Sequence, residues 1–122
     1  MIWRRPFVSA RATPTGDAGL AVLPSAGVGR VSHWVRVPGG ACPVSGNPIV
    51  GLVAVSYAPH TVVVELVSLR RFVRNALRRA NSVERLALAL HGPIAEAVGV
   101  PVKLDLWLLV RPGPQVYRVQ HG

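Results

Sequence analysis

The only cysteine of the chain, Cys42, lies in a stretch whose residue types suit a reactive thiol. It opens the run Cys42-Pro43-Val44-Ser45-Gly46-Asn47-Pro48, in which two prolines, a glycine and short polar side chains indicate a rigid turn. Such a turn places the sulfur beside exposed backbone N–H groups, which favour the nucleophilic thiolate. A lone cysteine is more commonly an inert small apolar side chain, so the turn alone leaves both interpretations open. A single thiol excludes an intramolecular disulfide framework and a zinc site built from several thiolates.

Carboxylate chemistry is limited to five acidic residues, which are Asp17, Glu65, Glu84, Glu96 and Asp105. Glu84 falls in the first turn of an expected helix, where the helix dipole favours a solvated carboxylate. From its position alone, Glu84 is therefore either a surface carboxylate or a binding group.

The basic residues are far more numerous and predict an anionic partner. Fourteen Lys and Arg residues against five Asp and Glu give a formal net charge of +9, which is typical of proteins that bind nucleic acid. Thirteen of the fourteen are arginines, whose planar fork suits phosphates and base edges. Codon usage in a GC-rich genome, or a thermophile's composition, would also explain that ratio, but explains the shortage of acids less well.

Six of these arginines cluster on one expected helix and at the start of the next. Arg70, Arg74 and Arg78 recur at every fourth residue, with Arg71, Arg79 and Arg85 flanking them. A charged helix face is commonly just solvated. Here few acids are available to neutralise it, so we interpret these six arginines as a nucleic-acid-binding surface.

The hydrophobic pattern predicts the elements that position these residues. Alternation over 28–37 indicates a half-buried strand, and the β-branched run 49–57 indicates a buried one. Residues 61–65 are expected to return as a second strand, forming a hairpin with 49–57. Residues 102–110 and 115–119 are expected to form a final hairpin.

Two helices are expected between the strands. Apolar residues recur at helical spacing from Val67, and Asn81-Ser82 offers an N-cap for a second helix that begins at Val83. Gly92-Pro93 is expected to kink or interrupt this second helix, and Gly99 to end it. The order predicts an α+β fold in which two helices cover one face of an antiparallel sheet.

Length and composition favour one domain. With 122 residues, half of them apolar, the chain suits a single core. Residues 1–26 are expected to form a loosely ordered arm or an edge strand, and residues 27–122 the domain. No stretch resembles a signal peptide or a membrane-spanning helix, so a soluble, reduced, cytoplasmic protein is expected.

The turn at 42–48 resembles the Cys-Pro-x-[Ser/Thr]-Gly-[Gln/Asn]-Pro signature of the QueF family. That family contains 7-cyano-7-deazaguanine reductases and their QueF-like amidinotransferase relatives of archaeosine type. Tyr57-Ala58-Pro59 sits where the family closes its strand with Tyr-x-Pro, and Glu65-Leu66-Val67-Ser68-Leu69-Arg70 resembles the family's Glu-[Ser/Leu]-Lys-Ser-x-Lys stretch. Glu84 falls, without a gap, where the family carries the glutamate that holds the base. These anchors cover residues 40–86, and the strand order extends the resemblance to the C-terminus.

The resemblance implies a fold, an assembly and a chemistry. The fold would be the tunnelling fold (T-fold), ββααββ, whose subunits join their sheets into a homo-oligomeric ring, a pentamer or a decamer, with sites between subunits. Cys42 would attack a nitrile carbon to give a covalent thioimide. Glu84 would hold the edge of the deazaguanine base, with Glu65 and Ser68 as further substrate-binding residues.

The sequence also departs from the family at residues that matter for its chemistry. Ile49 stands where the family has its general acid, an Asp, and Val83 replaces the His before the base-binding Glu. Val67 replaces the first Lys of the stretch associated with NADPH, while Arg70 retains the second positive charge. The remaining candidates for a proton donor, from elsewhere in the ring, are His33, His60 and Asp105.

These residues leave three functions open. The leading one is a QueF-like tRNA-modification enzyme, in which ammonia releases a formamidine from the thioimide and the arginines and N-terminal arm bind tRNA; it needs no cofactor and no metal. The second is an NADPH-dependent reductase that acts on the free nitrile base. The third is a non-catalytic T-fold binding or scaffold protein.

Overall fold

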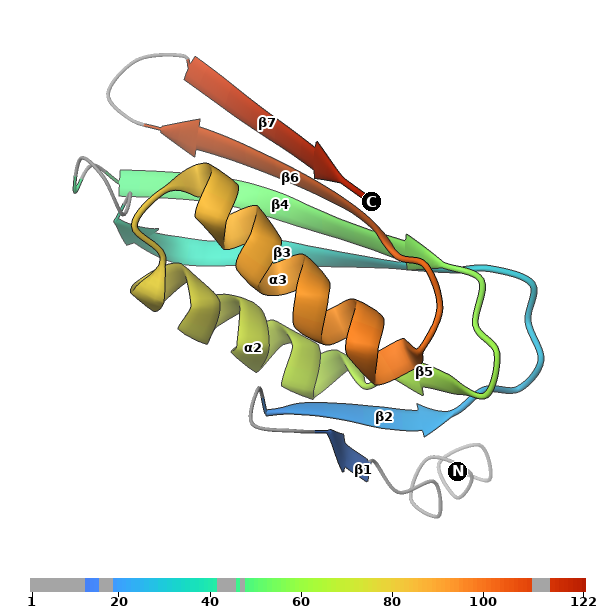
Figure 1. The fold of residues 1–122 in the computed structure, drawn as a ribbon. Helices are drawn as coiled ribbons and strands as arrows, with labels where there is room; N and C mark the ends of the chain where they lie inside the picture. The colour runs from blue at the N-terminus through green and yellow to red at the C-terminus, as the bar shows by residue number, and fades with distance from the viewer. Residues whose placement is uncertain (1–12, 16–18, 42–45, 47, 111–114) are drawn as a thin grey trace, which may run out of the picture.

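A computed structural model describes residues 13–15, 19–41, 46, 48–110 and 115–122, and its centre is a four-stranded antiparallel sheet (Figure 1). Its strands follow chain order across the sheet: β3 (Val31–Ala41), β4 (Pro48–Tyr57), β6 (Lys103–Val110) and β7 (Gln115–His121). Every neighbouring pair is antiparallel. The predicted strands and the final hairpin are therefore confirmed, with β3 beginning and ending a few residues later than the alternation indicates.

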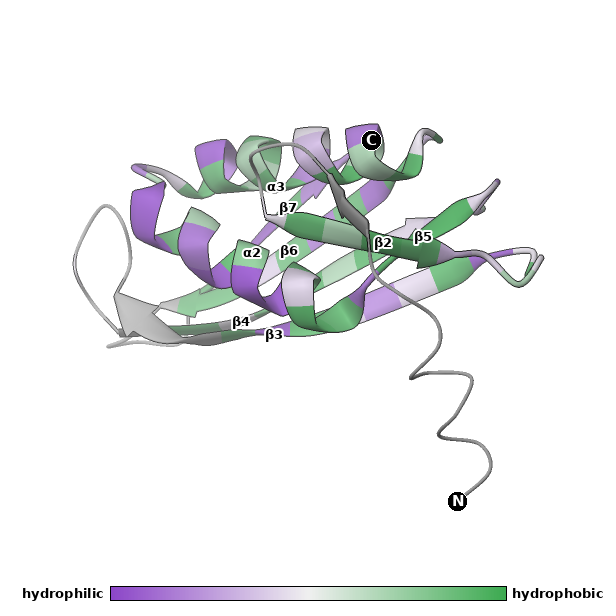
Figure 2. Ribbon diagram, turned by 90° about the horizontal axis from the view of Figure 1, so that it is seen from below, coloured by the Kyte–Doolittle hydropathy of each residue, from purple (hydrophilic) through white to green (hydrophobic). Residues whose placement is uncertain are grey.

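Two helices, α2 (Leu66–Arg79) and α3 (Val83–Val98), form a second layer over one face of this sheet (Figure 2). Alternate strand residues, such as Val53 and Leu106, are fully buried against the helices' Leu69, Leu90 and Ile94. The α+β fold with both helices on one face is confirmed. Neither helix in the described chain combines the length and apolar character needed to cross a membrane.

The ends of α3 follow the predicted signals, but its interior does not. Ser82 accepts a hydrogen bond from the Arg85 N–H as N-cap, and Gly99 ends the helix with a left-handed φ of 67°. Gly92-Pro93 neither interrupts the helix nor ends it, since α3 continues to Val98. Pro93 has no backbone N–H, so the carbonyl of Ala89 lacks the hydrogen bond that it would otherwise accept within the helix. Ala89 is exposed, so water can take the place of the lost donor there.

A second, three-stranded sheet contains β1 (Thr13–Thr15), β2 (Leu20–Pro24) and β5 (Val62–Val64), in the order β1-β2-β5. The predicted hairpin between 61–65 and 49–57 is wrong, because β5 pairs with β2. Both edges of β4 are already occupied, by β3 and β6, and leave no place for β5.

Part of the expected N-terminal arm belongs to the packed domain. Leu20 is 1% exposed and Val22 is also buried, so β2 contributes to the core that the sequence assigns to residues 27–122. Residues 1–12 lie outside the described part of the chain.

Gly51 allows β4 and β6 to approach closely. A Cβ at this position would overlap the backbone carbonyl of Trp107 and the side chain of Leu108, which lie on the neighbouring strand. Because one of these atoms belongs to the backbone, the sheet itself would have to shift.

We therefore expect Gly51→Ala to destabilise the protein by about 1–3 kcal/mol, the usual cost of overpacking. Gly92→Ala is the matched control, because its Cβ meets nothing within 4 Å and an exposed helical alanine stabilises by about 0.5–1 kcal/mol. Urea unfolding followed by circular dichroism measures both. Equal stability of Gly51→Ala and the parent would contradict this account of the β4–β6 contact.

Candidate functional site

Cys42, the predicted nucleophile, lies outside the described residues, but the strands on either side of it locate one end of the molecule. β3 ends at Ala41 and β4 begins at Pro48. In Figure 1 these strand ends lie at the same end of the molecule as the connection between α2 and α3. Glu84 stands in the first turn of α3, directly after that connection. The topology thus brings Glu84 to the end of the sheet at which residues 42–47 join the strands.

The carboxylate of Glu84 is exposed, and no hydrogen bond or ion pair within the described chain uses it. The helix N-terminus is capped instead by Ser82, whose hydroxyl accepts the Arg85 N–H at 3.1 Å. Glu84 therefore keeps both oxygens available to accept hydrogen bonds from a ligand.

Glu65 and Ser68, the other predicted substrate-binding residues, are engaged inside the fold. Glu65 is the N-cap of α2 and accepts the N–H groups of Val67 and Ser68. Ser68 is buried; its Oγ accepts the Ala21 N–H at 2.9 Å and donates to the Glu65 carbonyl. These contacts join β2 to the start of α2. They use the polar atoms that a substrate would otherwise contact.

The three residues at which the sequence departs from the QueF pattern are apolar, and two of them pack in the fold. Ile49 is 1% exposed and belongs to the main core, so its side chain takes part in packing and carries no proton. Val83 is partly buried against the same core. Val67 is 64% exposed at the start of α2.

The three alternative proton donors lie far from the strand ends, Ala41 and Pro48, between which Cys42 falls in the sequence. His33 is eight residues from Ala41 on β3, roughly 26 Å at strand rise. Asp105 pairs with Ala54, six residues from Pro48 and thus roughly 20 Å away. His60 follows the opposite end of β4. All three therefore lie far from Ala41 and Pro48, the strand ends that flank the segment containing Cys42.

The surroundings of His33 and Asp105 also disfavour proton donation near neutral pH. Burial lowers the pKa of His33, whose Nε2 lies 2.8 Å from the Tyr57 hydroxyl. Hydrogen bonds from the Arg118 guanidinium lower the pKa of Asp105. His33 is therefore largely neutral and Asp105 ionised, and neither form is an acid.

The six predicted nucleic-acid-binding arginines are all exposed, and five of them belong to α2. Helix α2 contains no acidic residue after its Glu65 cap. The one ion pair found in the described chain joins Arg118 to Asp105 on the sheet. The positive charge of α2 is thus not neutralised by neighbouring carboxylates, which leaves a field that attracts polyanions. The six residues are Arg70, Arg71, Arg74, Arg78, Arg79 and Arg85.

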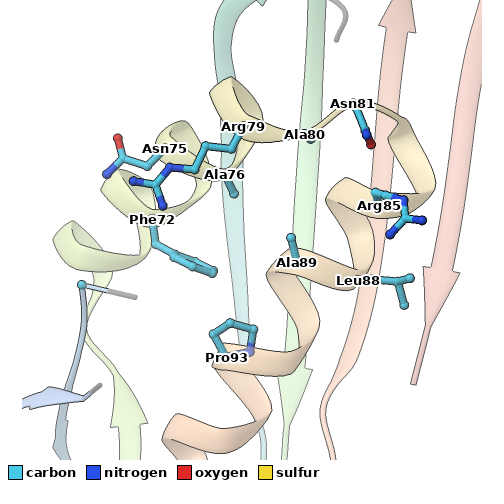
Figure 3. Close-up of a pocket in the computed structure, with 11 residues that line it drawn as sticks. Phe72, Asn75, Ala76, Arg79, Ala80, Asn81, Arg85, Leu88, Ala89 and Pro93 are labelled. Atoms are coloured by element: carbon cyan, nitrogen blue, oxygen red, sulfur yellow. The ribbon is translucent and has the colours of Figure 1, made fainter. Parts of the chain in front are cut away.

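A groove between α2 and α3, which the sequence analysis did not predict, adds a concave surface beside these arginines. Its volume is about 860 Å³. Phe72 points from α2 toward α3, while Arg79 and Arg85 come from the two facing helices (Figure 3). Small residues such as Ala76 and Ala89 leave the space between them. Small residues at positions where two helices face each other are the sequence signal that could have indicated this groove.

Within the described part of the chain, no three His, Cys, Asp or Glu side chains gather as metal ligands would. Comparison with models of known protein families gives no match, and comparison with curated proteins gives none either.

The buried His33 makes stability depend on pH. Because burial lowers its pKa in the folded state, the unfolded chain binds the proton more readily. Its contribution to stability is full above the ordinary histidine pKa of about 6.5 and is lost as the pH falls below that value toward the folded-state pKa. We expect the urea midpoint to fall between about pH 7.5 and about pH 5, and to fall less in His33→Gln. The same pH dependence in both proteins would contradict a role for His33.

Proposed function

We propose that this protein is a QueF-like enzyme that modifies a 7-cyano-7-deazaguanine base in tRNA. The observation that carries the proposal is the convergence at one end of the sheet. The strand ends Ala41 and Pro48, on either side of the segment containing Cys42, and the first turn of α3, with the Glu84 carboxylate, lie at that end. Acid-free α2 ends at the same place with Arg78 and Arg79, which supports a substrate that carries phosphates.

The chemistry assigned to Cys42 is nucleophilic addition followed by substitution. The sulfur forms a bond to the nitrile carbon, and the nitrile nitrogen takes up one proton to give a thioimide. Ammonia then forms a bond to the same carbon, the carbon–sulfur bond breaks, and a formamidine and the thiol result. The proton released by the thiol balances the first step, so the reaction needs no carboxylic acid at Ile49 for its stoichiometry.

Glu84 has the role of holding the base. Its carboxylate can accept two parallel hydrogen bonds from the N–H and NH₂ groups of the deazaguanine edge. Because it makes no contact inside the described fold, binding the base breaks no existing hydrogen bond. Glu65 and Ser68 support the site indirectly, by fixing the start of α2.

The T-fold and its ring are part of the same proposal. The four main strands and two helices follow the order ββααββ, and the sheet order follows the chain. Strands β3 and β7 are the two edges of this sheet. An unpaired edge at each side allows the sheet of one subunit to continue into the next by head-to-tail pairing, which closes into a ring when the rotation permits.

The buried Ile49 supports a second candidate function. Since the position of the family's acid is part of the core, a binding or scaffold protein that has lost catalysis fits the same fold. The NADPH-dependent reductase has less support, because Val67 leaves Arg70 alone to bind a cofactor phosphate in that stretch.

Formation of the thioimide is the direct test. Incubation with 7-cyano-7-deazaguanine is expected to raise the intact mass of the protein by one molecule of the nitrile, and Cys42→Ala is expected to abolish that increase. An adduct without NADPH oxidation distinguishes the leading function from the reductase. If the parent protein forms no adduct, the binding or scaffold function remains.

Glu84→Gln tests the assigned role of the carboxylate. We expect it to slow adduct formation at least about 10-fold, because loss of charge-assisted hydrogen bonds costs about 1.5–3 kcal/mol. Glu96→Gln is the matched control, since Glu96 is exposed on the same helix. Equal rates in the two variants would contradict the role of Glu84.

Binding of tRNA by α2 is tested by the salt dependence of affinity. Replacing Arg70, Arg74 and Arg78 by Gln is expected to weaken binding and to reduce the slope of log affinity against log salt by up to about 2.7, roughly 0.9 for each phosphate contact. The triple Lys variant keeps the charge and should keep most of the slope. A slope unchanged in the Gln variant would show that α2 does not contact the phosphates.

A further inference from the structure

None of the residues that the structure describes covers the face of the four-stranded sheet that points away from the helices. On β3, His33 and Val35 are buried, whereas Ser32, Trp34 and Arg36 on the opposite face are exposed. Trp34 is 60% exposed. A large aromatic ring presented on an open sheet is typical of a contact surface.

Three planar groups lie next to one another on this face. The ring centroids of Trp34 and Trp107 are 5.9 Å apart, and the Arg118 guanidinium carbon lies 5.2 Å from the Trp107 ring centroid. Two hydrogen bonds to Asp105, of 3.0 and 2.7 Å, hold the guanidinium in place. The row crosses the sheet from β3 to β7, with the smaller Ala54 of β4 beside Trp34. These planes form a surface on which flat ligands can stack.

A hollow of about 560 Å³ lies beside Trp34 on the same face. It has room for one ring stacked on the indole. Polar side chains in the lining can donate or accept hydrogen bonds at the edge of that ring. Apart from Asp105, which is paired with Arg118, they are Ser32, Ser56, Lys103, Gln120 and His121.

The positive charge of this face indicates that the ligand carries negative charges as well as flat rings. Arg30, Arg36 and Lys103 are exposed, and none has an acidic partner among the described residues. Asp105, the one described acid on this face, is already paired with Arg118. A ligand that combines flat rings with regularly spaced negative charges fits both features. An acidic peptide supplies the charges but only occasionally a ring.

We propose that the open sheet face binds unpaired nucleotides of single-stranded nucleic acid. One base stacks on Trp34 in the hollow, the next lies over Trp107 and Arg118, and the cations contact the phosphates. Stacking of bases on exposed aromatic side chains with flanking cations is how single strands are commonly held. This surface lies on the opposite layer from α2 and does not depend on the chemistry of Cys42.

The test uses fluorescence anisotropy of a labelled ten-residue oligouridylate, with oligothymidylate of the same length to distinguish RNA from DNA. Trp34→Ala is expected to weaken binding about 10-fold, within the range for one stacked base. Trp34→Phe should restore most of the affinity. Leu88→Ala is the control, since Leu88 is an exposed apolar side chain on the helix face. A blunt duplex of the same length should compete poorly.

The result that overturns the proposal is equally specific. Equal affinity of Trp34→Ala and Leu88→Ala, or equal competition by the duplex, means that no base stacks on Trp34. Sedimentation at the same protein concentrations gives a second check. If Trp34→Ala dissociates an oligomer and leaves oligonucleotide affinity unchanged, this face is a contact between copies of the chain instead.

Discussion

The hydrogen bonds at the start of α2 hold the two sheets and the helical layer in one arrangement. The Glu65 N–H donates to the Ala21 carbonyl at 2.9 Å, and Ser68 accepts the Ala21 N–H. One step earlier, the Val64 N–H donates to the Tyr57 hydroxyl, which also contacts His33. Because the chain leaves the main sheet at Tyr57, this junction sets the direction of α2. The positions of α3, β6 and β7 then follow from it.

The acidic residues explain why so much positive charge remains on the surface. Glu65 is used as a helix cap and Asp105 as the partner of Arg118, so two of the few carboxylates serve the fold. Of the other three, Glu84 and Glu96 are on α3, and Asp17 lies outside the described residues. As a result, α2 and the open sheet face, which lie on opposite layers, both present arginines that form no ion pair with the described residues, such as Arg74 and Arg36. The excess positive charge is thus divided between two surfaces that face in opposite directions.

The sequence predicted what depends on local pattern and failed where long-range pairing decides. The alternation of apolar and polar residues predicted the main strands. Ser82 and Gly99 predicted the ends of α3, because a helix cap depends only on residues within one turn. β5 pairs with β2 because β4 has no free edge, and the local sequence pattern holds no information about which edges are free. Glu65 and Ser68 match the family's stretch, but a Glu three residues before a Ser is also a helix-capping arrangement. Only the structure distinguishes their engaged polar atoms from the free carboxylate of Glu84. The groove and the Trp34–Trp107 row depend on register between separate elements.

The position of the single lysine separates the two basic surfaces chemically. Lys103, which borders the hollow beside Trp34, is the only lysine of the chain. Acylation of lysine removes its positive charge, whereas the guanidinium of arginine stays charged at any physiological pH. Any lysine acylation of this protein therefore falls on the sheet face and lowers its charge, while α2 remains unchanged. One surface is open to reversible covalent control and the other is permanently cationic.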